Sequence, residues 1–245
     1  MPFSTEQTSP ASASRNVLAL QGLEPFGIGG RRMCFVHPHE PKKCVKVLRT
    51  DDGRTVRLKN KKHIIPARWR REYNNNTHEM RTLGDLEKRI GPEMGKHLPR
   101  CYGMVPTDMG PGLVLDLVRD HDGGISRSIR ELITVGYDLS ALRASFDEFG
   151  KFLSKNLVLT RNLLDHNLVV EMREDGPGPM FLIDGFGDPA WIPFSKWFPA
   201  LGRAKVRKRL DEAWRRFENF AAAGGASEEL IRNSSWGQGM LKHRG

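Results

Sequence analysis

The stretch that decides the fold of the first half of the chain is residues 33–48, which read MCFVHPHEPKKCVKVL. Two short apolar runs, Met33–Val36 and Cys44–Leu48, flank a turn that contains two prolines. Runs of this composition on either side of a turn predict a β-hairpin. Lys46 stands between two valines in the second run. Lysine is seldom fully buried unless it is paired, so Lys46 is either an outward-facing residue of a half-exposed strand or a functional residue with an acidic partner.

Further elements follow on both sides of this hairpin. A strand-like stretch begins at Leu18–Leu20, and the glycine-rich run Gly27-Ile28-Gly29-Gly30 precedes the hairpin as a tight turn. Residues 51–66 are polar and basic and predict a long loop, and a helix is expected from about 67 to 89. Strands are expected over 100–105 and 113–118, with a Gly-Pro-Gly turn between them. The first half therefore predicts about five antiparallel strands with one helix inserted.

The second half of the sequence has a different character. Apolar residues recur at steps of three and four over residues 140–157, which predicts an amphipathic helix. Shorter helical segments are expected over 125–135 and from 196 onward, and a short hairpin over 167–183. Strands followed by helices indicate an α+β fold. We expect a two-lobed protein with an N-terminal five-stranded antiparallel sheet and one helix, followed by a reduced, mainly helical C-terminal lobe.

Length and composition set the domain organisation. The chain has 245 residues, which is enough for one domain with its own core. We expect a disordered leader over 1–16, a single domain over 17–223 and a tail over 224–245, with the lobes meeting near residue 120. The three cysteines are expected to be reduced thiols, since an odd count argues against a disulfide framework. The sequence shows neither a secretory signal nor an apolar run of membrane-spanning length, so we expect a cytoplasmic location.

The charge is strongly positive and clustered. The net charge is +10 and the isoelectric point is near 9.8. One basic cluster lies within residues 54–71 and another within 203–209, where a predicted helix carries Leu210, Trp214 and Phe217 on its other face. Such clusters are either solvated faces or surfaces that attract nucleic acid or an acidic partner.

The order of elements resembles that of protein kinases, and the sequence resembles one bacterial family in particular, the YrbL family of PhoP-regulatory-network proteins. The segments that carry the resemblance are Gly27–Pro38, Lys43–Val47, Leu98–Gly103, Thr107–Asp108, Gly112–Gly123, Ile183–Asp184 with Gly187, and Ile192–Pro193. They cover most of residues 20–200. The resemblance implies a protein-kinase-like fold that holds ATP and Mg²⁺ between its lobes.

The resemblance also implies a set of nucleotide-binding residues in the first lobe. Gly27 and Gly29 would let the backbone approach phosphates, because glycine has no Cβ; a plain tight turn explains them equally well. Lys46 would contact phosphates and pair with a helix carboxylate, for which Glu72 is the first choice and Glu79 the second. Backbone groups from Asp116 to Val118 would bind the adenine edge, unless this segment is only the end of a strand.

In the second lobe the resemblance implies a metal pair, Asn167 and Asp184. Mg²⁺ prefers oxygen ligands, and Asp184 follows a predicted strand in the run Asp-Gly-Phe-Gly. The alternative is an aspartate that only caps a glycine-rich turn.

One departure from the kinase pattern concerns catalysis. The position of the usual catalytic aspartate, five residues before Asn167, is Asn162, and the loop lysine is replaced by Leu164. An amide cannot accept a proton as a carboxylate does. Asp165 and Asp188 are nearby acids, but neither stands at the expected position. The leading hypothesis is therefore either a degenerate phosphotransferase or a nucleotide-sensing pseudokinase with a regulatory role, acting on an acceptor or a protein that the sequence does not name. The alternative is a non-catalytic binding module that uses its basic face, with weak, non-specific affinity for polyanions.

Overall fold

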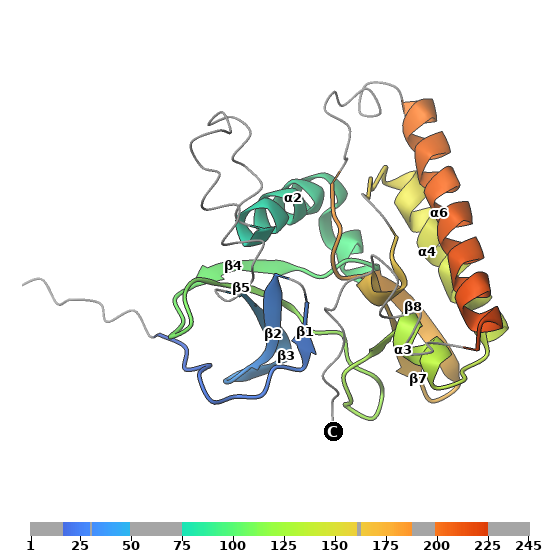
Figure 1. The fold of residues 1–245 in the computed structure, drawn as a ribbon. Coiled ribbons are helices and arrows are strands. Elements are labelled where there is room, and N and C mark those ends of the chain that lie inside the picture. The colour runs from blue at the N-terminus through green and yellow to red at the C-terminus, as the bar shows by residue number, and fades with distance from the viewer. Residues whose placement is uncertain (1–16, 30, 50–74, 161–162, 188–198, 225–245) are drawn as a thin grey trace, which may run out of the picture.

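The computed structural model describes residues 17–29, 31–49, 75–160, 163–187 and 199–224 (Figure 1). Its N-terminal part is a five-stranded antiparallel sheet in the order β1-β2-β3-β5-β4. The strands are β1 (Gly27–Ile28), β2 (Arg32–His37), β3 (Glu40–Leu48), β4 (Cys101–Val105) and β5 (Gly112–Asp116). Between β3 and β4 the chain forms α2 (Asn75–Ile90) and the 3₁₀ helix η2 (Gly91–Lys96), and α2 lies across one face of the sheet (Figure 1).

The alternation of side chains along β3 decides which face Lys46 occupies. Val45 and Val47 belong to a small apolar cluster on the face away from α2. Because successive side chains of a strand point to opposite faces, Lys46 must lie on the face that α2 covers. Its neighbour Cys44 packs into the main core on that same face. A lysine thus enters the interior as a consequence of burying the two valines.

The helix α2 presents one buried stripe to the sheet. The stripe consists of Asn76, Glu79, Leu83 and Leu86, which follow one another at steps of three and four residues. Its last two members are apolar and join the main core, whereas its first two are polar and buried. The polar end of the stripe therefore has to find its partners on the sheet.

The C-terminal part combines a small sheet with helices. Its sheet has the order β6-β7-β8, and α4 and α6 lie side by side at its flank (Figure 1). The elements are β6 (Arg127–Ser128), α3 (Ile129–Thr134), η3 (Leu139–Leu142), α4 (Arg143–Lys155), η4 (Asp165–Asn167), β7 (Leu168–Arg173), β8 (Gly176–Leu182) and α6 (Pro199–Ala222). Phe146 of α4 contacts Trp214 and Phe217 of α6, with ring centroids 5.0 Å and 5.9 Å away.

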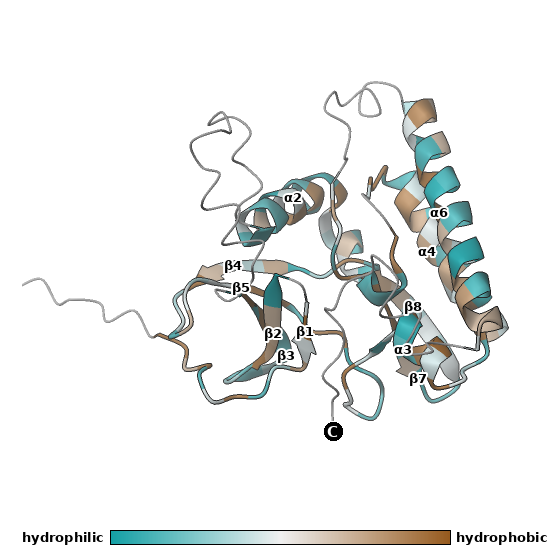
Figure 2. Ribbon diagram, in the orientation of Figure 1, coloured by the Kyte–Doolittle hydropathy of each residue, from teal (hydrophilic) through white to brown (hydrophobic). Residues whose placement is uncertain are grey.

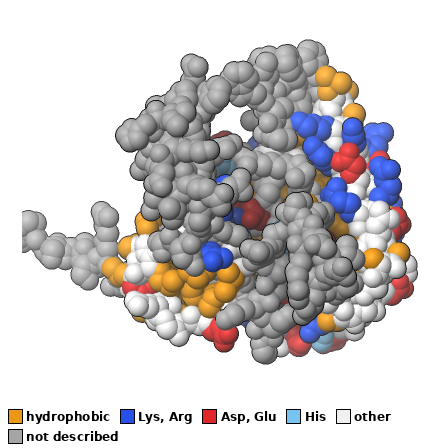
Figure 3. Space-filling model, in the orientation of Figure 1, with side chains coloured by type: hydrophobic (Ala, Val, Ile, Leu, Met, Phe, Trp, Pro, Cys, Tyr) orange, Lys and Arg blue, Asp and Glu red, His pale blue; other side chains and the backbone are white. Residues whose placement is uncertain are grey.

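The helix α6 is amphipathic, as the sequence predicts. Val206, Ala213, Trp214 and Phe217 are buried against the core, while Arg203, Arg207, Lys208 and Arg215 are exposed. Figure 2 shows the hydrophilic outer face of α6, and Figure 3 shows its basic side chains gathered on the surface. Within the described ranges, no helix is long and apolar enough to cross a membrane. The basic cluster of residues 54–71 lies outside the described residues.

His97 ties the two parts together. Its buried Nδ1 lies 2.8 Å from the carbonyl oxygen of Met180 on β8, and its own carbonyl accepts a hydrogen bond of 3.0 Å from the amide of Leu182. The link from β5 to β6 is also fastened, because the Asp120 carboxylate accepts hydrogen bonds from Ser126 and from the backbone of Met172. The segment over residues 120–124, where the two lobes were expected to meet, is a closed turn, because backbone hydrogen bonds of 2.9 Å join Asp120 to Gly123 and Gly124.

The α+β class, the five-stranded sheet with one inserted helix and the mainly helical second half are confirmed. The fifth strand was assigned to the wrong segment, however. Leu18 forms only an isolated bridge with Thr107, and the fifth strand is Gly27–Ile28, which the sequence predicted as a turn. The hairpin expected over 167–183 is present, and its turn is short, since β7 ends at Arg173 and β8 begins at Gly176, so that Pro177 and Pro179 lie within the strand. Its two prolines are tolerated because β8 is an edge strand. The predicted leader and tail, apart from Gly224, fall outside the described residues.

Two glycines test this packing in opposite directions. A Cβ added to Gly112 on β5 would lie 2.5 Å from Val45 Cγ1, whereas one added to Gly84 in α2 would have nothing within 4 Å. We expect Gly112→Ala to lower the free energy of unfolding by about 1–3 kcal/mol through overpacking. We expect Gly84→Ala to raise it by about 0.5–1 kcal/mol, because alanine loses less backbone entropy in a helix. Urea unfolding of both variants measures this, and equal effects would contradict the packing described.

Candidate functional site

Four charged side chains from four segments meet between the two parts of the protein. They are Arg32 on β2, Lys46 on β3, Glu79 on α2 and Asp184 after β8, and we call them the charge cluster. Lys46 Nζ lies 2.8 Å from Glu79 Oε1 and donates to the carbonyl oxygen of Ile183 at 2.7 Å. The guanidinium of Arg32 donates to the carboxylates of both Glu79 and Asp184. Arg32 and Asp184, which are 152 positions apart in the sequence, are thus joined by a direct ion pair.

The charge cluster is buried at one end and open at the other. The side chains of Arg32 and Lys46 are 8% exposed and that of Glu79 is 4% exposed, but that of Asp184 is 46% exposed. Figure 3 shows charged side chains of both signs recessed in the middle of this face. A ligand approaching from solvent would therefore meet Asp184 first and the two cations behind it.

Mutual attraction keeps Lys46 and Asp184 charged despite burial. Burial alone would lower the pKa of Lys46, but the neighbouring acidic groups, Glu79 first and then Asp184, together outweigh burial, and the pKa is raised above its usual value. For Asp184, burial would raise the pKa, but Arg32 and Lys46 hold it well below the usual range. The cluster holds two positive and two negative charges and is therefore neutral overall.

The helix partner of Lys46 is Glu79, the second choice from the sequence, and the first choice, Glu72, lies outside the described residues. In the helix predicted over residues 67–89 the two acids would share one stripe, since they are seven residues apart, so periodicity alone does not separate them. The asparagine run at residues 74–76 was the available signal, because asparagine favours helix starts over helix interiors and places Glu79 within the helix. Asn76 also holds the strand in place, since its Nδ2 donates to the Lys46 carbonyl oxygen at 2.7 Å.

Arg32 is the functional candidate that sequence reasoning missed. Nothing in its immediate sequence surroundings distinguishes it from Arg31. In the hairpin, Cys34 pairs with Lys46, so Arg32, two residues before Cys34, lies on the same face as Lys46. The alternation along β2, once combined with the hairpin register, was the signal that could have found it.

The loop after β8 brings Asp184 and Asn167 together. The amide of Ile183 donates to the carbonyl oxygen of Asn167 at 2.9 Å, which places the two predicted metal ligands on neighbouring backbone segments. Gly185 and Gly187 both have positive φ angles, 83° and 104°, a conformation that glycine adopts without the Cβ clash. The amide of Gly185 donates to Asp184 Oδ1 at 2.6 Å. Asp184 therefore stabilises its own turn and also reaches the charge cluster.

The arrangement at Asp184 does not fit a divalent cation as it stands. Arg32 occupies Oδ2 and the Gly185 amide occupies Oδ1. A metal ion on this carboxylate would lie beside the guanidinium and be repelled by it. The described parts of the chain contain no group of three or more histidine, cysteine, aspartate or glutamate side chains suited to a metal. At the predicted magnesium ligand Asp184, the guanidinium of Arg32 already supplies the positive charge.

The glycine run lies at one edge of the sheet, whereas β5 is an inner strand. Gly27 pairs with Cys34 in the ladder, and the amide of Gly29 closes the turn on the Arg32 carbonyl at 2.8 Å. At the end of β5, the Asp116 carboxylate accepts from the Arg100 amide and from the Tyr102 hydroxyl.

Backbone groups of the next two residues are also used within the protein. Leu117 donates to Lys42, and the Val118 carbonyl accepts from Ser126. In the described part of the chain the Val118 N–H has no acceptor. It therefore remains the candidate donor to an adenine edge, whereas the side chain of Asp116 has a structural role.

The nearby acid Asp165 is engaged in the interior. Arg130 grips its carboxylate with two hydrogen bonds of 2.8 Å, and both side chains are about 5% exposed or less. Burial would raise the pKa of Asp165, but hydrogen bonds from His166 and Arg130 lower it. A carboxylate held in this way orders the loop around η4 and is a poor proton acceptor. Asn162 and Asp188 lie outside the described residues.

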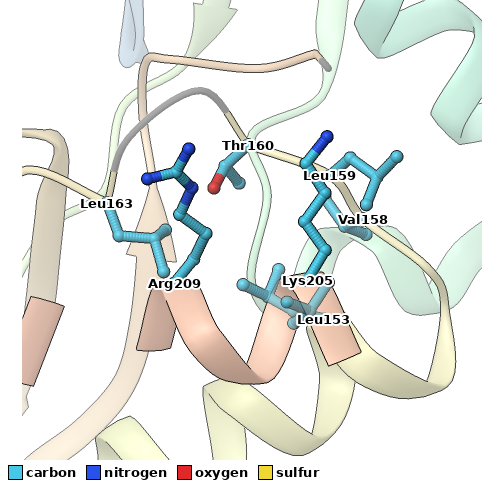
Figure 4. A pocket seen from close by; sticks show the side chains of 8 residues that line it. Leu153, Val158, Leu159, Thr160, Leu163, Lys205 and Arg209 are labelled. Carbon is cyan, nitrogen blue, oxygen red and sulfur yellow. The ribbon is translucent and has the colours of Figure 1, made fainter. Parts of the chain in front are cut away.

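A separate pocket lies between α6 and the segment after α4 (Figure 4). Arg209 and Lys205 flank it, and its floor is formed by Leu153, Val158 and Leu163 among others. It leaves essentially no room for a water-sized molecule, and none of its lining residues belongs to the charge cluster. We therefore assign it no ligand.

The charge cluster joins the N-terminal sheet, the helix α2 and the loop after β8, so the protein has an ionic site at the junction of its two parts. The chain belongs to the family described as PhoP regulatory network protein YrbL, whose model matches residues 18–218. It is 26% identical over 205 residues to the uncharacterized protein YrbL of Escherichia coli K12, covering 82% of this chain and 86% of the relative. The match to YrbL of Shigella flexneri has the same extent.

Among solved structures, the chain is similar to Rad53 residues 1–466 in complex with AMP-PNP. The identity is 12% and the TM-score 0.47, and the match covers 84% of this chain and 52% of the other.

The role of Asp165 can be tested against a matched surface pair. Removing one partner of a buried ion pair typically costs about 3–5 kcal/mol, and removing one of an exposed pair about 0–1 kcal/mol. We expect Asp165→Ala to show the larger loss and Asp147→Ala, whose partner Arg143 is exposed, the smaller one.

The loss on Asp165→Ala should also depend on pH. Because the folded pKa is lowered, the stabilisation is present above the unfolded value of about 3.9 and disappears as the pH falls through the folded value. Chemical denaturation at pH 7 and near pH 3 measures both effects. Equal losses for the two variants at pH 7 would contradict the structural role of Asp165.

Proposed function

We propose that this protein binds an adenine nucleotide between its two parts, in the manner of a protein kinase, and acts either as a slow phosphotransferase or as a nucleotide-sensing regulator. The observation that carries the proposal is the buried pair of Lys46 and Glu79 beside the half-exposed side chain of Asp184. A lysine on a strand, a glutamate on the following helix and an aspartate after a later strand form the phosphate-binding set of protein kinases.

A purely structural role explains this cluster less well. Burying charged groups removes them from water at a cost of several kcal/mol each, and apolar residues of the same volume often give equal or greater stability. Clusters of ionised groups with shifted pKa values occur preferentially at functional sites. The cluster also opens to the surface at Asp184, where phosphate groups would enter.

Fast protein phosphorylation is not part of the proposal. Asn162 replaces the usual catalytic aspartate, and Asp165 is bound to Arg130. General-base help typically contributes about 10²–10⁴-fold to a rate. Positioning and electrostatics carry most of phosphoryl transfer, so slow transfer to an acceptor is compatible with this site.

Nucleotide binding is tested by thermal unfolding. A ligand at a hundredfold excess over its dissociation constant stabilises a protein by about 2.7 kcal/mol, which corresponds to a rise of about 5–10 °C in Tm for a chain of this size. We expect this shift for the wild type with ADP or ATP. Lys46→Met should reduce the affinity about 10- to 100-fold, since hydrogen bonds to charged groups contribute about 1.5–3 kcal/mol. Asp184→Ala should also weaken binding, because Arg32 then loses the carboxylate that holds its guanidinium at the site.

The control is Lys42→Met, which removes an exposed lysine from the same strand and should leave the shift unchanged. A wild type that does not shift with millimolar ADP or ATP would refute the proposal. Equal losses for the Lys42 and Lys46 variants would show that the nucleotide does not bind at the charge cluster.

The exposed basic face of α6 supports a second, weaker activity. Arg203, Arg207 and Lys208 point to solvent while the opposite face is buried. A solvated basic face binds polyanions through counterion release, without reading sequence. We propose only salt-sensitive, non-specific binding at this face.

This binding is measured with unrelated oligonucleotides at low and at physiological salt. We expect dissociation constants of about 10⁻⁴–10⁻⁶ M at physiological salt and tighter binding at low salt. The double change Arg207→Glu with Lys208→Glu should weaken it more than Lys151→Glu with Lys155→Glu, two exposed lysines on α4. Sequence-dependent binding that survives physiological salt would instead favour a nucleic-acid-binding module.

A further inference from the structure

The guanidinium of Arg32 occupies the place beside Asp184 where a kinase-like site would hold a divalent cation. It is fixed from three sides, by Glu79, by Asp184 and, at 3.5 Å, by the side-chain oxygen of Asn76. These partners are needed, because burying a guanidinium without them would cost free energy of folding. Three side chains from two other segments hold Arg32 against the carboxylate.

Arg32 also retains donors for a ligand. A guanidinium has five N–H groups in a planar fork. The described contacts use two on Nη1 and one on Nη2. Within the described residues, the second Nη2 N–H and the Nε N–H have no acceptor. Arginine forks match phosphate oxygens in a bidentate manner, which an ammonium does not.

We propose that Arg32 takes the place of the divalent cation, so that this protein binds nucleotide phosphates without a metal ion. The inference rests on the nucleotide site proposed above. Arg32 neutralises Asp184, which would otherwise repel the phosphates, and presents its remaining N–H groups to them. Lys46 supplies the second positive charge from β3.

The charges of the cluster make a metal ion unnecessary for charge balance, and they would repel one placed at Asp184. Two cations and two carboxylates already balance, so Asp184 carries no uncompensated charge that needs a metal. A divalent ion would have to displace the guanidinium from Asp184 and leave it beside a second cation. Two positive charges this close repel each other strongly at the effective dielectric constant of a protein surface, and a divalent ion doubles the charge on one side.

The experiment compares ADP binding by isothermal titration calorimetry with EDTA and with excess Mg²⁺. For the wild type we expect dissociation constants within about threefold of each other in the two conditions. For Arg32→Gln we expect a loss of at least tenfold in EDTA that Mg²⁺ partly restores, because Asp184 is then free to bind a cation. Arg143→Gln, an exposed arginine on α4, is the matched control and should behave as the wild type.

A second readout does not depend on nucleotide. Mn²⁺ alone, titrated and followed by electron paramagnetic resonance, should bind Arg32→Gln at least tenfold more tightly than the wild type. Arg32→Lys keeps the charge and protects the test if Arg32→Gln unfolds; we expect it to exclude Mn²⁺ but to bind ADP less tightly than the wild type. Melting curves without ligand verify that each variant is folded.

The outcomes separate this inference from the proposed function. Wild-type binding of ADP only in the presence of Mg²⁺ would overturn the role of Arg32 and leave the nucleotide site standing. Binding in neither condition would overturn both. Equal Mn²⁺ affinity of the wild type and Arg32→Gln would also refute the inference, because Asp184 would then be open to metal in the presence of the guanidinium.

Discussion

The Glu79 carboxylate is the constraint on which the rest of the site depends. It accepts from Lys46 on one oxygen and from Arg32 on the other, so a single helix residue fixes two neighbouring strands. The sheet can present two cations on one face only because this carboxylate sits above them. Arg32 then reaches Asp184, and Lys46 reaches the backbone of Ile183. The helix, the hairpin and the loop after β8 are thereby positioned relative to one another by one buried acid.

Most elements of the fold can be predicted from local patterns in the sequence. The hairpin over 33–48, the amphipathic helix near 140–157 and the basic helix near 200 were all predicted, because apolar periodicity and turn residues are local signals. The errors fell where local signals were misleading. Glycines at residues 27–29 suggested a turn, but the first two residues of this run form an edge strand whose pairing with β2 depends on tertiary contact.

The site was harder to predict than the fold, for reasons of register. Lys46 stood out because a lysine between valines is unusual in a buried strand, and Asp184 because it follows an apolar run and precedes glycines. Glu79 and Glu72 are seven residues apart in the predicted helix, so apolar periodicity does not decide which of them pairs with Lys46. Arg32 becomes meaningful only when the hairpin register sets it on the face of Lys46. No single segment contains that information.

The two hydrogen bonds of His97 to β8 bear on how a ligand would enter. They join the two parts at their base, on buried groups that water does not reach. The relative position of the two parts is therefore already fixed before a ligand binds. The ordering of the site is completed during folding, so a bound molecule would lose its own freedom but require little rearrangement of its host. We expect such a site to select ligands by their shape. The rate at which a ligand dissociates would then depend on local movements of the residues around the opening of the site.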